Sequence, residues 1–487
     1  MNRKIVVITL LSILFIYIIF CFYGYPLLLG DTECFLPVAF KIRLHQQLIN
    51  PFYNAGFIKG NKFLFYPPFY PFFMSFFIIE AKAIYAYVGL TIVNLSTIFV
   101  VSLIVQHLIK INSINRASPT IDRCFLVFFF IAICTFVSPG NSRPEVLCYL
   151  ILSLTIYLFL KPVKYRFFLI GILGSLGVLT SPVFGIYLSF LILLYIFYRF
   201  PNSYKVFASL FLGALCVLFF FLVTYPYPVA EMVKTMQIHF SNVIVNRDEV
   251  FSFGSFFQHY FFSGNAAFIG LVFAVALIIV VKRTFTDNKS IKGKYFISLL
   301  LVLLVISIVY FGFRNFAMSY YLTVLAPLML IIIFQEYISQ TDKGIKLFLL
   351  STVILASTSM LRLTVNFGLT FLSSKFDIGS VEKKLSHYTE DQGKTVGISP
   401  SFWIFFSGQV LCKPVIYYKG NSPKNYDYII LQQVGTGIYS PPRLEGYDLI
   451  ENYFENKELR VLGIKTASYS PFYQYAAYKK HEKNSLF

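Results

Sequence analysis

The chain has 487 residues, of which 57% are hydrophobic, 19% are aromatic and only 13% are charged. Ordinary globular chains have roughly 25% charged residues, so this composition excludes a soluble globular protein. The formal net charge is +19. Basic loops beside anionic lipid explain this charge better than nucleic-acid binding does, and we expect no nucleic-acid partner.

The hydrophobic residues are clustered in long runs that contain almost no charges. A helix needs about 20 residues to cross about 30 Å of hydrocarbon. Eleven runs approach or reach this length and are predicted to be transmembrane helices: Ile5–Leu29, Ala83–Leu108, Cys124–Val137, Val146–Leu160, Phe167–Thr180, Val183–Tyr198, Val206–Thr224, Ala266–Val281, Tyr295–Phe311, Tyr320–Phe334 and Leu347–Leu361. The first is too long for a signal peptide and has no small-residue cleavage site, so it is predicted to be an uncleaved helix.

The distribution of Lys and Arg predicts the orientation of these helices. With the N-terminus inside, the short inner loops contain 17 Lys and Arg, and the longer outer loops contain nine. Cytoplasmic loops are enriched in these residues, so the N-terminus is predicted to be cytoplasmic. Eleven spans then place the C-terminus outside the membrane. The predicted localisation is the plasma (inner) membrane.

The chain outside the helices is predicted to lie mainly on the outer face. Residues 30–82 form a first outer loop, in which Pro68–Ile79 is too short to span and is predicted to be an interfacial helix. Residues 225–265 form a second outer loop, which could be a lid or an interfacial anchor. Residues 1–365 are predicted to be the membrane domain and residues 366–487 a small extracytoplasmic α/β domain. Predicted strands are Tyr428–Gln432, Val461–Ile464 and Tyr473–Tyr478, and Trp403 is predicted to be buried.

Acidic residues follow two of the predicted spans on the outer side. Asp31 and Glu33 come directly after the first span, at the mouth of any cavity that the helices enclose. Glu145 opens the fourth span in the sequence Arg143-Pro144-Glu145, where it would stabilise the positive end of a helix. Each also has a simpler interpretation. Asp31 and Glu33 could be solvated, and Glu145 could cap its helix or pair locally with Arg143.

The order of these elements resembles the GT-C superfamily of membrane glycosyltransferases. The shared features are the acidic motif after the first span, interfacial helices, a Tyr66-Pro67-Pro68 motif and an Arg-Pro-Glu sequence opening the fourth span. The resemblance is to bacterial relatives of protein O-mannosyltransferases and lipid A aminoarabinose transferases, and it covers residues 1 to about 365. It implies an all-α polytopic fold of GT-C type and transfer of a sugar from a polyprenyl-phosphate donor to an acceptor hydroxyl.

The resemblance also implies roles for individual residues. Asp31 would be the general base, Glu145 would orient the acceptor or help to bind a divalent cation, and Glu33 could share the catalytic role. The aminoarabinose transferases have Lys where this chain has Tyr66, so the cation that faces the donor phosphate would come from elsewhere. The candidates for substrate binding are Lys62, Tyr66, Arg143, His239, Arg247 and Arg314. His239 also fits a surface histidine, and Arg314 could reach the lipid headgroups.

No Walker loop or dinucleotide fingerprint occurs, so no nucleotide or organic cofactor is expected, while a divalent cation stays open. The expected partners are the polyprenyl-phosphate sugar, a glycan, lipid or protein acceptor, and membrane lipids. Two other functions remain. A glycan polymerase or ligase would use a lipid-linked donor on the same face. A transporter or flippase would normally carry ionisable residues near the middle of its spans, which are almost free of charge here.

Overall fold

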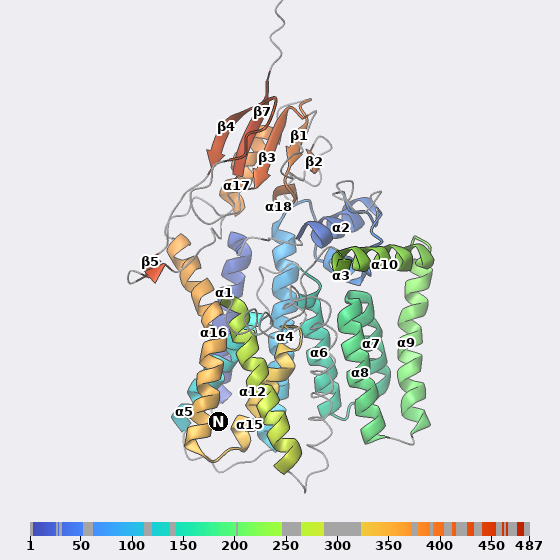
Figure 1. The fold of residues 1–487 in the computed structure, drawn as a ribbon, viewed down its shortest axis with the longest axis vertical. Coiled ribbons are helices and arrows are strands. Elements are labelled where there is room, and N and C mark those ends of the chain that lie inside the picture. The colour runs from blue at the N-terminus through green and yellow to red at the C-terminus, as the bar shows by residue number, and fades with distance from the viewer. Residues whose placement is uncertain are drawn as a thin grey trace, which may run out of the picture.

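The structure, a computed structural model, describes residues 3–25, 28, 32–51, 62–111, 119–136, 143–200, 203–245, 264–286, 323–371, 378–389, 393–403, 412–414, 426–432, 441–453, 460–461, 464–465 and 475–481. Its long helices are α1 (Arg3–Tyr23), α4 (Ile84–Ile111), α5 (Pro119–Phe136), α6 (Glu145–Leu160), α7 (Arg166–Thr180), α8 (Pro182–Arg199), α9 (Tyr204–Thr224), α12 (Gly264–Thr286), α15 (Ala326–Ser339) and α16 (Lys343–Phe371). They stand side by side as an upright bundle (Figure 1).

Several of these helices are apolar enough to cross a membrane. Within the described part of the chain, four have the length and composition of a span: Lys4–Tyr23, Ile84–Ile111, Tyr204–Thr224 and Lys343–Val365. Shorter apolar helices include α6, α7 and α15. The chain is therefore a mostly helical membrane protein, as the composition predicted. The predicted span Tyr295–Phe311 lies outside the described residues.

A cluster of ionic side chains ties four helices together at the lower end of the bundle in Figure 1. Near the start of α5, Asp122 accepts hydrogen bonds from the Tyr337 hydroxyl at 3.0 Å and from Nζ of Lys346, in the first turn of α16, at 3.4 Å. Nε of Arg283, near the end of α12, lies 2.8 Å from the Glu336 carboxylate near the end of α15. The starts of α5 and α16 and the ends of α12 and α15 therefore meet at one end, so α5 and α16 run away from this end and α12 and α15 run toward it.

The first helix ends six residues before the predicted boundary at Leu29, and hydrogen bonding explains why. The Gly24 amide donates to the Cys21 carbonyl, and the Tyr25 amide donates to the Phe20 carbonyl. Gly24 has φ +63°, in the left-handed region that favours glycine. This is the Schellman arrangement, which satisfies the last carbonyls of a helix and turns the chain away from it. The hydropathy run continues past this point, but the helix does not.

Glycines allow α7 to pack unusually close to α9. A Cβ atom added at Gly171 of α7 would lie 2.0 Å from the carbonyl oxygen of Leu210 in α9. A Cβ atom added at Gly213 of α9 would lie 2.1 Å from the carbonyl oxygen of Phe168 in α7. The two backbones are thus in direct contact, as small residues permit between membrane helices. This contact fixes α9 at the side of the bundle.

Gly171→Ala is expected to destabilise the protein by about 1–3 kcal/mol, because the two helices must separate to admit the methyl group. Gly368→Ala in α16 is the matched control, since a Cβ atom there would meet nothing within 4 Å. Alanine costs a helix about 0.5–1 kcal/mol less than glycine, so the control is expected to be neutral or stabilising. The measurement is thermal unfolding of both variants in one detergent. Equal melting temperatures would contradict the close contact.

The remaining described elements gather at the upper end of the bundle in Figure 1. Short helices α2 (Thr32–His45), α3 (Phe69–Ser75) and α10 (Val229–Val245) lie across this end. The predicted interfacial helix of the first outer loop corresponds to α3, and the second outer loop contains α10. Helix α2, which contains an internal Pro37, adds a second helix to the first loop.

The C-terminal residues form a small sheet beyond this end (Figure 1). Five strands, β1 (Val396–Ile398), β2 (Cys412–Pro414), β3 (Tyr428–Gln432), β4 (Tyr447–Tyr453) and β7 (Tyr475–Lys480), pair in the order β2-β1-β3-β7-β4. Strand β1 is parallel to β2 and β3, and β7 is antiparallel to β3 and β4. The sheet is accompanied by α17 (Ile378–Thr389) and α18 (Pro400–Trp403). The C-terminal residues therefore contain a small sheet accompanied by helices, as the predicted fold class included.

Two details of this domain differ from the sequence prediction. The run Val461–Ile464 is not one strand, because β5 (Arg460–Val461) pairs antiparallel with β6 (Ile464–Lys465). Helix α16 continues to Phe371, beyond the predicted domain boundary at residue 365. Trp403 is buried at 2% exposure, as predicted, and Nζ of Lys41 in α2 lies 5.6 Å from the centre of its ring. The domain therefore contacts the bundle through α2.

Candidate functional site

The start of α6 carries a buried ion pair. The Glu145 side chain is 1% exposed, and Nε of Arg143 lies 3.0 Å from its carboxylate. Pro144 between them has φ −57°, the value that proline imposes and a helix requires. A buried carboxylate is costly unless it is paired, so Arg143 is the partner that allows the Glu145 side chain to be buried. The local pair that the sequence left open is present, and it is buried.

Helix α3 packs a tyrosine against this pair. Tyr70 is completely buried. Burial raises the pKa of the Tyr70 hydroxyl well above its ordinary value, and the neighbouring Glu145 carboxylate and Cys148 thiol raise it further. Tyr70 therefore keeps its proton at neutral pH, beside a carboxylate that can accept a hydrogen bond. The sequence interpretation of this segment as an aromatic anchor missed Tyr70. A signal was available, because a buried tyrosine hydroxyl usually requires a polar partner.

The same tyrosine connects Glu145 with the start of α2. Phe35, in the first turns of α2, contacts Tyr70 edge-on with ring centroids 5.8 Å apart. Asp31 directly precedes α2 in the chain but lies outside the described residues. Glu33 belongs to the first turn of α2, and only its backbone is described. The segment that follows Asp31 and the residue Glu145 therefore both lie next to Tyr70.

Tyr66 of the Tyr-Pro-Pro motif is also buried. Its hydroxyl donates a hydrogen bond to Oγ of Ser181 at 3.0 Å. Ser181 lies between α7 and α8, so this bond fixes the first outer loop to the α7–α8 turn. The centre of the Tyr66 ring lies 5.3 Å from the centre of the Phe35 ring. Tyr66 is thus part of the aromatic packing around Phe35 of α2, and nothing in the sequence indicated Ser181 as its partner.

An apolar hollow lies on the other side of α3. Its volume is about 590 Å³, within the range of small-molecule sites. The lining comes from the end of α2, from α3, α7 and α9, and from the chain after α9: Ile42, Gln46, Gln47, Leu48, Pro68, Phe69, Phe72, Leu176, Leu179, Cys216, Val217, Phe220, Phe221, Thr224, Tyr225 and Pro226. Phe69 and Phe72 of α3 face this hollow, while Tyr70 of the same helix lies against Glu145. One short helix therefore separates an apolar hollow from a buried carboxylate.

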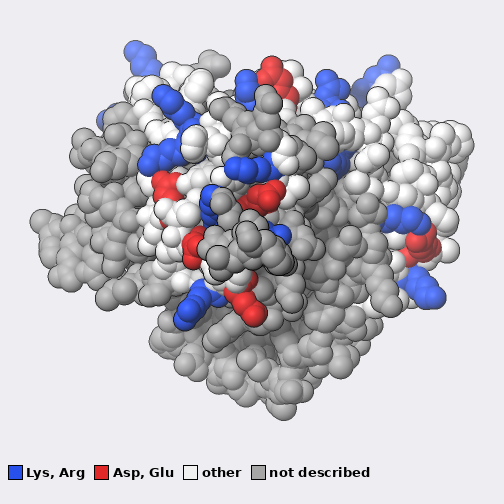
Figure 2. All heavy atoms as spheres, turned by 90° about the horizontal axis from the view of Figure 1, so that it is seen from above, with Lys and Arg blue, Asp and Glu red and all other residues white. Residues whose placement is uncertain are grey.

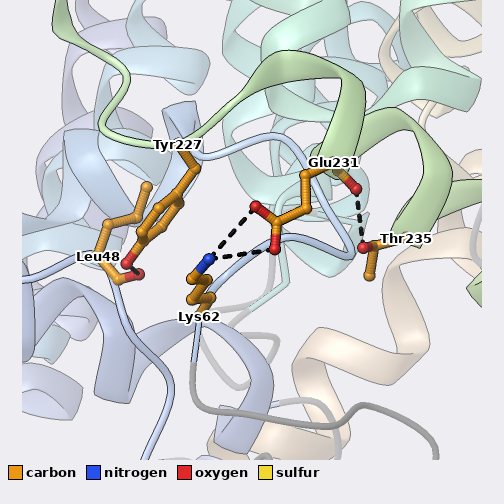
Figure 3. Close-up of polar contacts among 5 residues, drawn as sticks. All are labelled: Leu48, Lys62, Tyr227, Glu231 and Thr235. Carbon is orange, nitrogen blue, oxygen red and sulfur yellow. Dashed lines mark hydrogen bonds and ion pairs between the residues drawn. The ribbon is translucent and has the colours of Figure 1, made fainter.

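Lys62 pairs with Glu231 of α10 (Figure 3). Its Nζ is 3.2 Å from the Glu231 carboxylate, and the two side chains are 47% and 41% exposed. Nζ of Lys62 also lies 5.3 Å from the centre of the Tyr227 ring. Glu231 lies in the first turn of α10, within residues 225–265 of the predicted second outer loop. The pairing joins the two predicted outer loops, which are far apart in the sequence.

Three other predicted substrate-binding residues are less informative. His239 lies in α10, where only its backbone is described. Arg247 and Arg314 lie outside the described residues. Seen from above, acidic and basic side chains are interspersed over the described part of this end (Figure 2). An anion here would therefore be recognised by individual cations rather than by a broad basic field.

No protein-family model matches this chain, and no curated protein matches it. Among the described residues there is no group of three His, Cys, Asp or Glu that could hold a metal ion. The geometry above is therefore the basis for a functional proposal. It combines a buried carboxylate with its arginine, a neighbouring tyrosine, an apolar hollow and an exposed lysine at one end of the bundle.

Proposed function

We propose that the chain is a membrane glycosyltransferase of GT-C type that takes its sugar from a polyprenyl-phosphate donor. The observation that carries the proposal is the position of the buried Glu145–Arg143 pair. Tyr70 connects this pair to the segment that follows Asp31, and α3 lies between the pair and an apolar hollow. A lipid-linked donor keeps its chain in the bilayer and its phosphate at the surface. It therefore needs an apolar groove, a carboxylate and cations close together.

The proposed topology has eleven spans, a cytoplasmic N-terminus and an extracytoplasmic C-terminal domain in the plasma (inner) membrane. The directions of α5, α12, α15 and α16 support it. Lys346 and Arg283, which belong to the predicted inner loops, lie at the lower end of the bundle, while α2, α3, α10 and the sheet lie at the other end (Figure 1). Interfacial helices at the outer surface would place Lys62 and the hollow near headgroup depth.

The proposed reaction inverts the anomeric carbon. The acceptor hydroxyl attacks that carbon, its proton passes to the Asp31 carboxylate, and the bond to the phosphate oxygen breaks with its electron pair leaving on the polyprenyl phosphate. A positioned general base typically contributes about 10²–10⁴-fold. Glu145 orients the acceptor, and cations near the leaving phosphate stabilise its developing charge. Lys62 and Arg247 are the proposed cations, because Arg143 already neutralises Glu145.

A transporter or flippase is the second class to consider, because Asp122, Glu336 and Lys346 are buried ionisable residues. They lie in the first or last turns of their helices rather than near the middle. Each of them has an ionic partner in a neighbouring helix. Such positions suit a structural clamp better than a transport pathway, where charges are expected near the midplane.

The test is a transfer assay with the purified full chain and membrane extract as the source of acceptor. Radiolabelled polyprenyl-monophosphate sugars are expected to donate label, and nucleotide sugars are not. Donors with a glycan on a polyprenyl diphosphate form the third arm. Label from the diphosphate donors alone would instead indicate a polymerase or ligase, and label from nucleotide sugars alone would contradict the proposal.

A further inference from the structure

The rim of the apolar hollow is linked to the Lys62–Glu231 pair by a short series of contacts. Leu48 and Tyr225 line the hollow. The Leu48 carbonyl accepts a hydrogen bond from the Tyr227 hydroxyl at 2.8 Å, and the rings of Tyr225 and Tyr227 are 5.9 Å apart. Lys62 lies over the Tyr227 ring (Figure 3). A single layer of side chains therefore separates the lysine ammonium from the hollow.

The ion pair itself is weakly held. Both side chains are more than 40% exposed, and the Glu231 carboxylate approaches Lys62 at 3.2 Å and 3.3 Å. Exposed pairs of this kind change an equilibrium constant by less than about fivefold. The pair can therefore open at little cost when a stronger anion approaches Lys62.

Both partners keep other stabilising contacts if the pair opens. Glu231 lies in the first turn of α10, where the positive end of the helix stabilises a carboxylate. The Lys62 ammonium remains over the Tyr227 ring, which attracts a cation. Met232, the next residue of α10, is buried with Leu64 and Tyr225, so the helix stays anchored. Only the carboxylate contact has to be exchanged.

We propose that Lys62–Glu231 is an exchangeable latch at the mouth of the hollow, in which the phosphate of an incoming lipid replaces Glu231 on Lys62 while the lipid chain occupies the hollow. Two features favour a lipid phosphate as the occupant, namely the positive charge of Lys62 and the apolar surface of the hollow and of α9. The hollow is lined mainly by apolar side chains, and α9 exposes Phe219 and Val223 along the bundle's side. Lys62 supplies three hydrogen-bond donors, and a terminal phosphate offers three acceptor oxygens where the Glu231 carboxylate offers two.

This inference rests on the proposed function only in identifying the lipid with the donor. It adds that Glu231 competes with that lipid and so limits its entry. The hydrogen bond from Tyr227 to Leu48 would keep the rim in place during the exchange. Binding, rather than transfer, is therefore the direct measure of the latch.

The experiment measures binding of a fluorescent long-chain polyprenyl phosphate to the full chain in detergent micelles. Glu231→Gln is expected to tighten binding by up to about fivefold, because the competing charge is removed. Lys62→Gln is expected to weaken it by about tenfold, because a charge-assisted hydrogen bond to phosphate is lost. Lys234→Gln, which removes an exposed cation from the same helix, is the matched control and is expected to have little effect.

Two further probes separate the phosphate from the chain. The corresponding polyprenol without phosphate is expected to bind all variants equally, and inorganic phosphate alone is expected not to compete. Unchanged or weaker binding by Glu231→Gln would overturn the latch, as would an equal response to the polyprenol. Wild-type melting temperatures check that the exposed substitutions leave the fold intact. Added salt screens the attraction between Lys62 and the phosphate, so it should weaken binding more in Glu231→Gln than in the wild type, where it also weakens the competing ion pair.

The two proposals fail in distinguishable ways. If Lys62→Gln weakens and Glu231→Gln tightens polyprenyl phosphate binding but no sugar is transferred, the glycosyltransferase proposal is wrong and the latch stands. If sugar is transferred but neither substitution changes polyprenyl phosphate binding, the latch is wrong and the proposed function stands.

Discussion

Asp31→Asn is expected to insert and fold normally but to lose sugar transfer by about 10²–10⁴-fold. Asparagine has nearly the same shape as aspartate but cannot accept the proton of the acceptor hydroxyl. The donor and acceptor would still bind, so the loss should appear in kcat rather than in KM. The measurement is the transfer assay with purified variant, together with its melting temperature in the same detergent.

Glu80→Gln is the matched control for this substitution. Glu80 is also an acidic residue of the first outer loop, and its exposed carboxylate pairs with Lys82 at 2.8 Å. Its variant should transfer sugar at the wild-type rate. Glu33→Gln decides whether Glu33 shares the role, because a comparable loss would assign both carboxylates to catalysis. Full transfer by Asp31→Asn would remove Asp31 as the base.

Arg143→Met is expected to destabilise the protein by about 3–5 kcal/mol. The substitution leaves the Glu145 carboxylate buried without its arginine, and an uncompensated buried charge is among the largest single-residue costs. Methionine fills similar apolar volume, so the loss of packing is small. Thermal or urea unfolding in one detergent measures the effect.

Two further variants isolate the cause. Arg143→Met combined with Glu145→Met should recover most of the stability, because apolar residues often replace a buried pair without loss, but it should not recover transfer. Lys82→Met removes a cation that also pairs with an acid two residues away, in an exposed setting. It should cost no more than about 1 kcal/mol. Equal stability of Arg143→Met and wild type would mean that the pair has no structural role.

Hydropathy predicted most described helices closely, but it misplaced several ends. The predicted run Val146–Leu160 differs from α6 by one residue, and Phe167–Thr180 differs from α7 by one residue. The predicted run Cys124–Val137 is shorter than α5, which begins at Pro119. The prediction missed this start because the charged residues Asp122 and Arg123, which belong to the helix, interrupt the hydropathy run. Charges end a hydropathy run but do not end a helix when they find partners, as Asp122 does in Lys346 and Tyr337.

Helix α15 begins later and ends later than its hydropathy run, and the two ends have different causes. The hydropathy run was predicted to begin at Tyr320, but α15 begins at Ala326, with Pro327 in its first turn. It continues past Phe334 to Ser339, because Glu336 pairs with Arg283 of α12 and Gln340. The start could have been predicted from proline. The end could not, because it depends on a helix distant in the sequence.

The sequence by itself determined the class of this protein. Its long apolar runs require lipid, its basic residues predict an orientation, and its acidic residues fall after spans on one predicted side. These are properties of composition and local spacing. Tertiary structure alone decided that the local Arg143–Glu145 pair is buried, that α3 divides its carboxylate from a hollow, that Tyr66 reaches Ser181 and that Lys62 pairs with Glu231. Those pairings join segments up to 169 residues apart, and the energy of a charge depends on what surrounds it, which spacing along a chain does not specify.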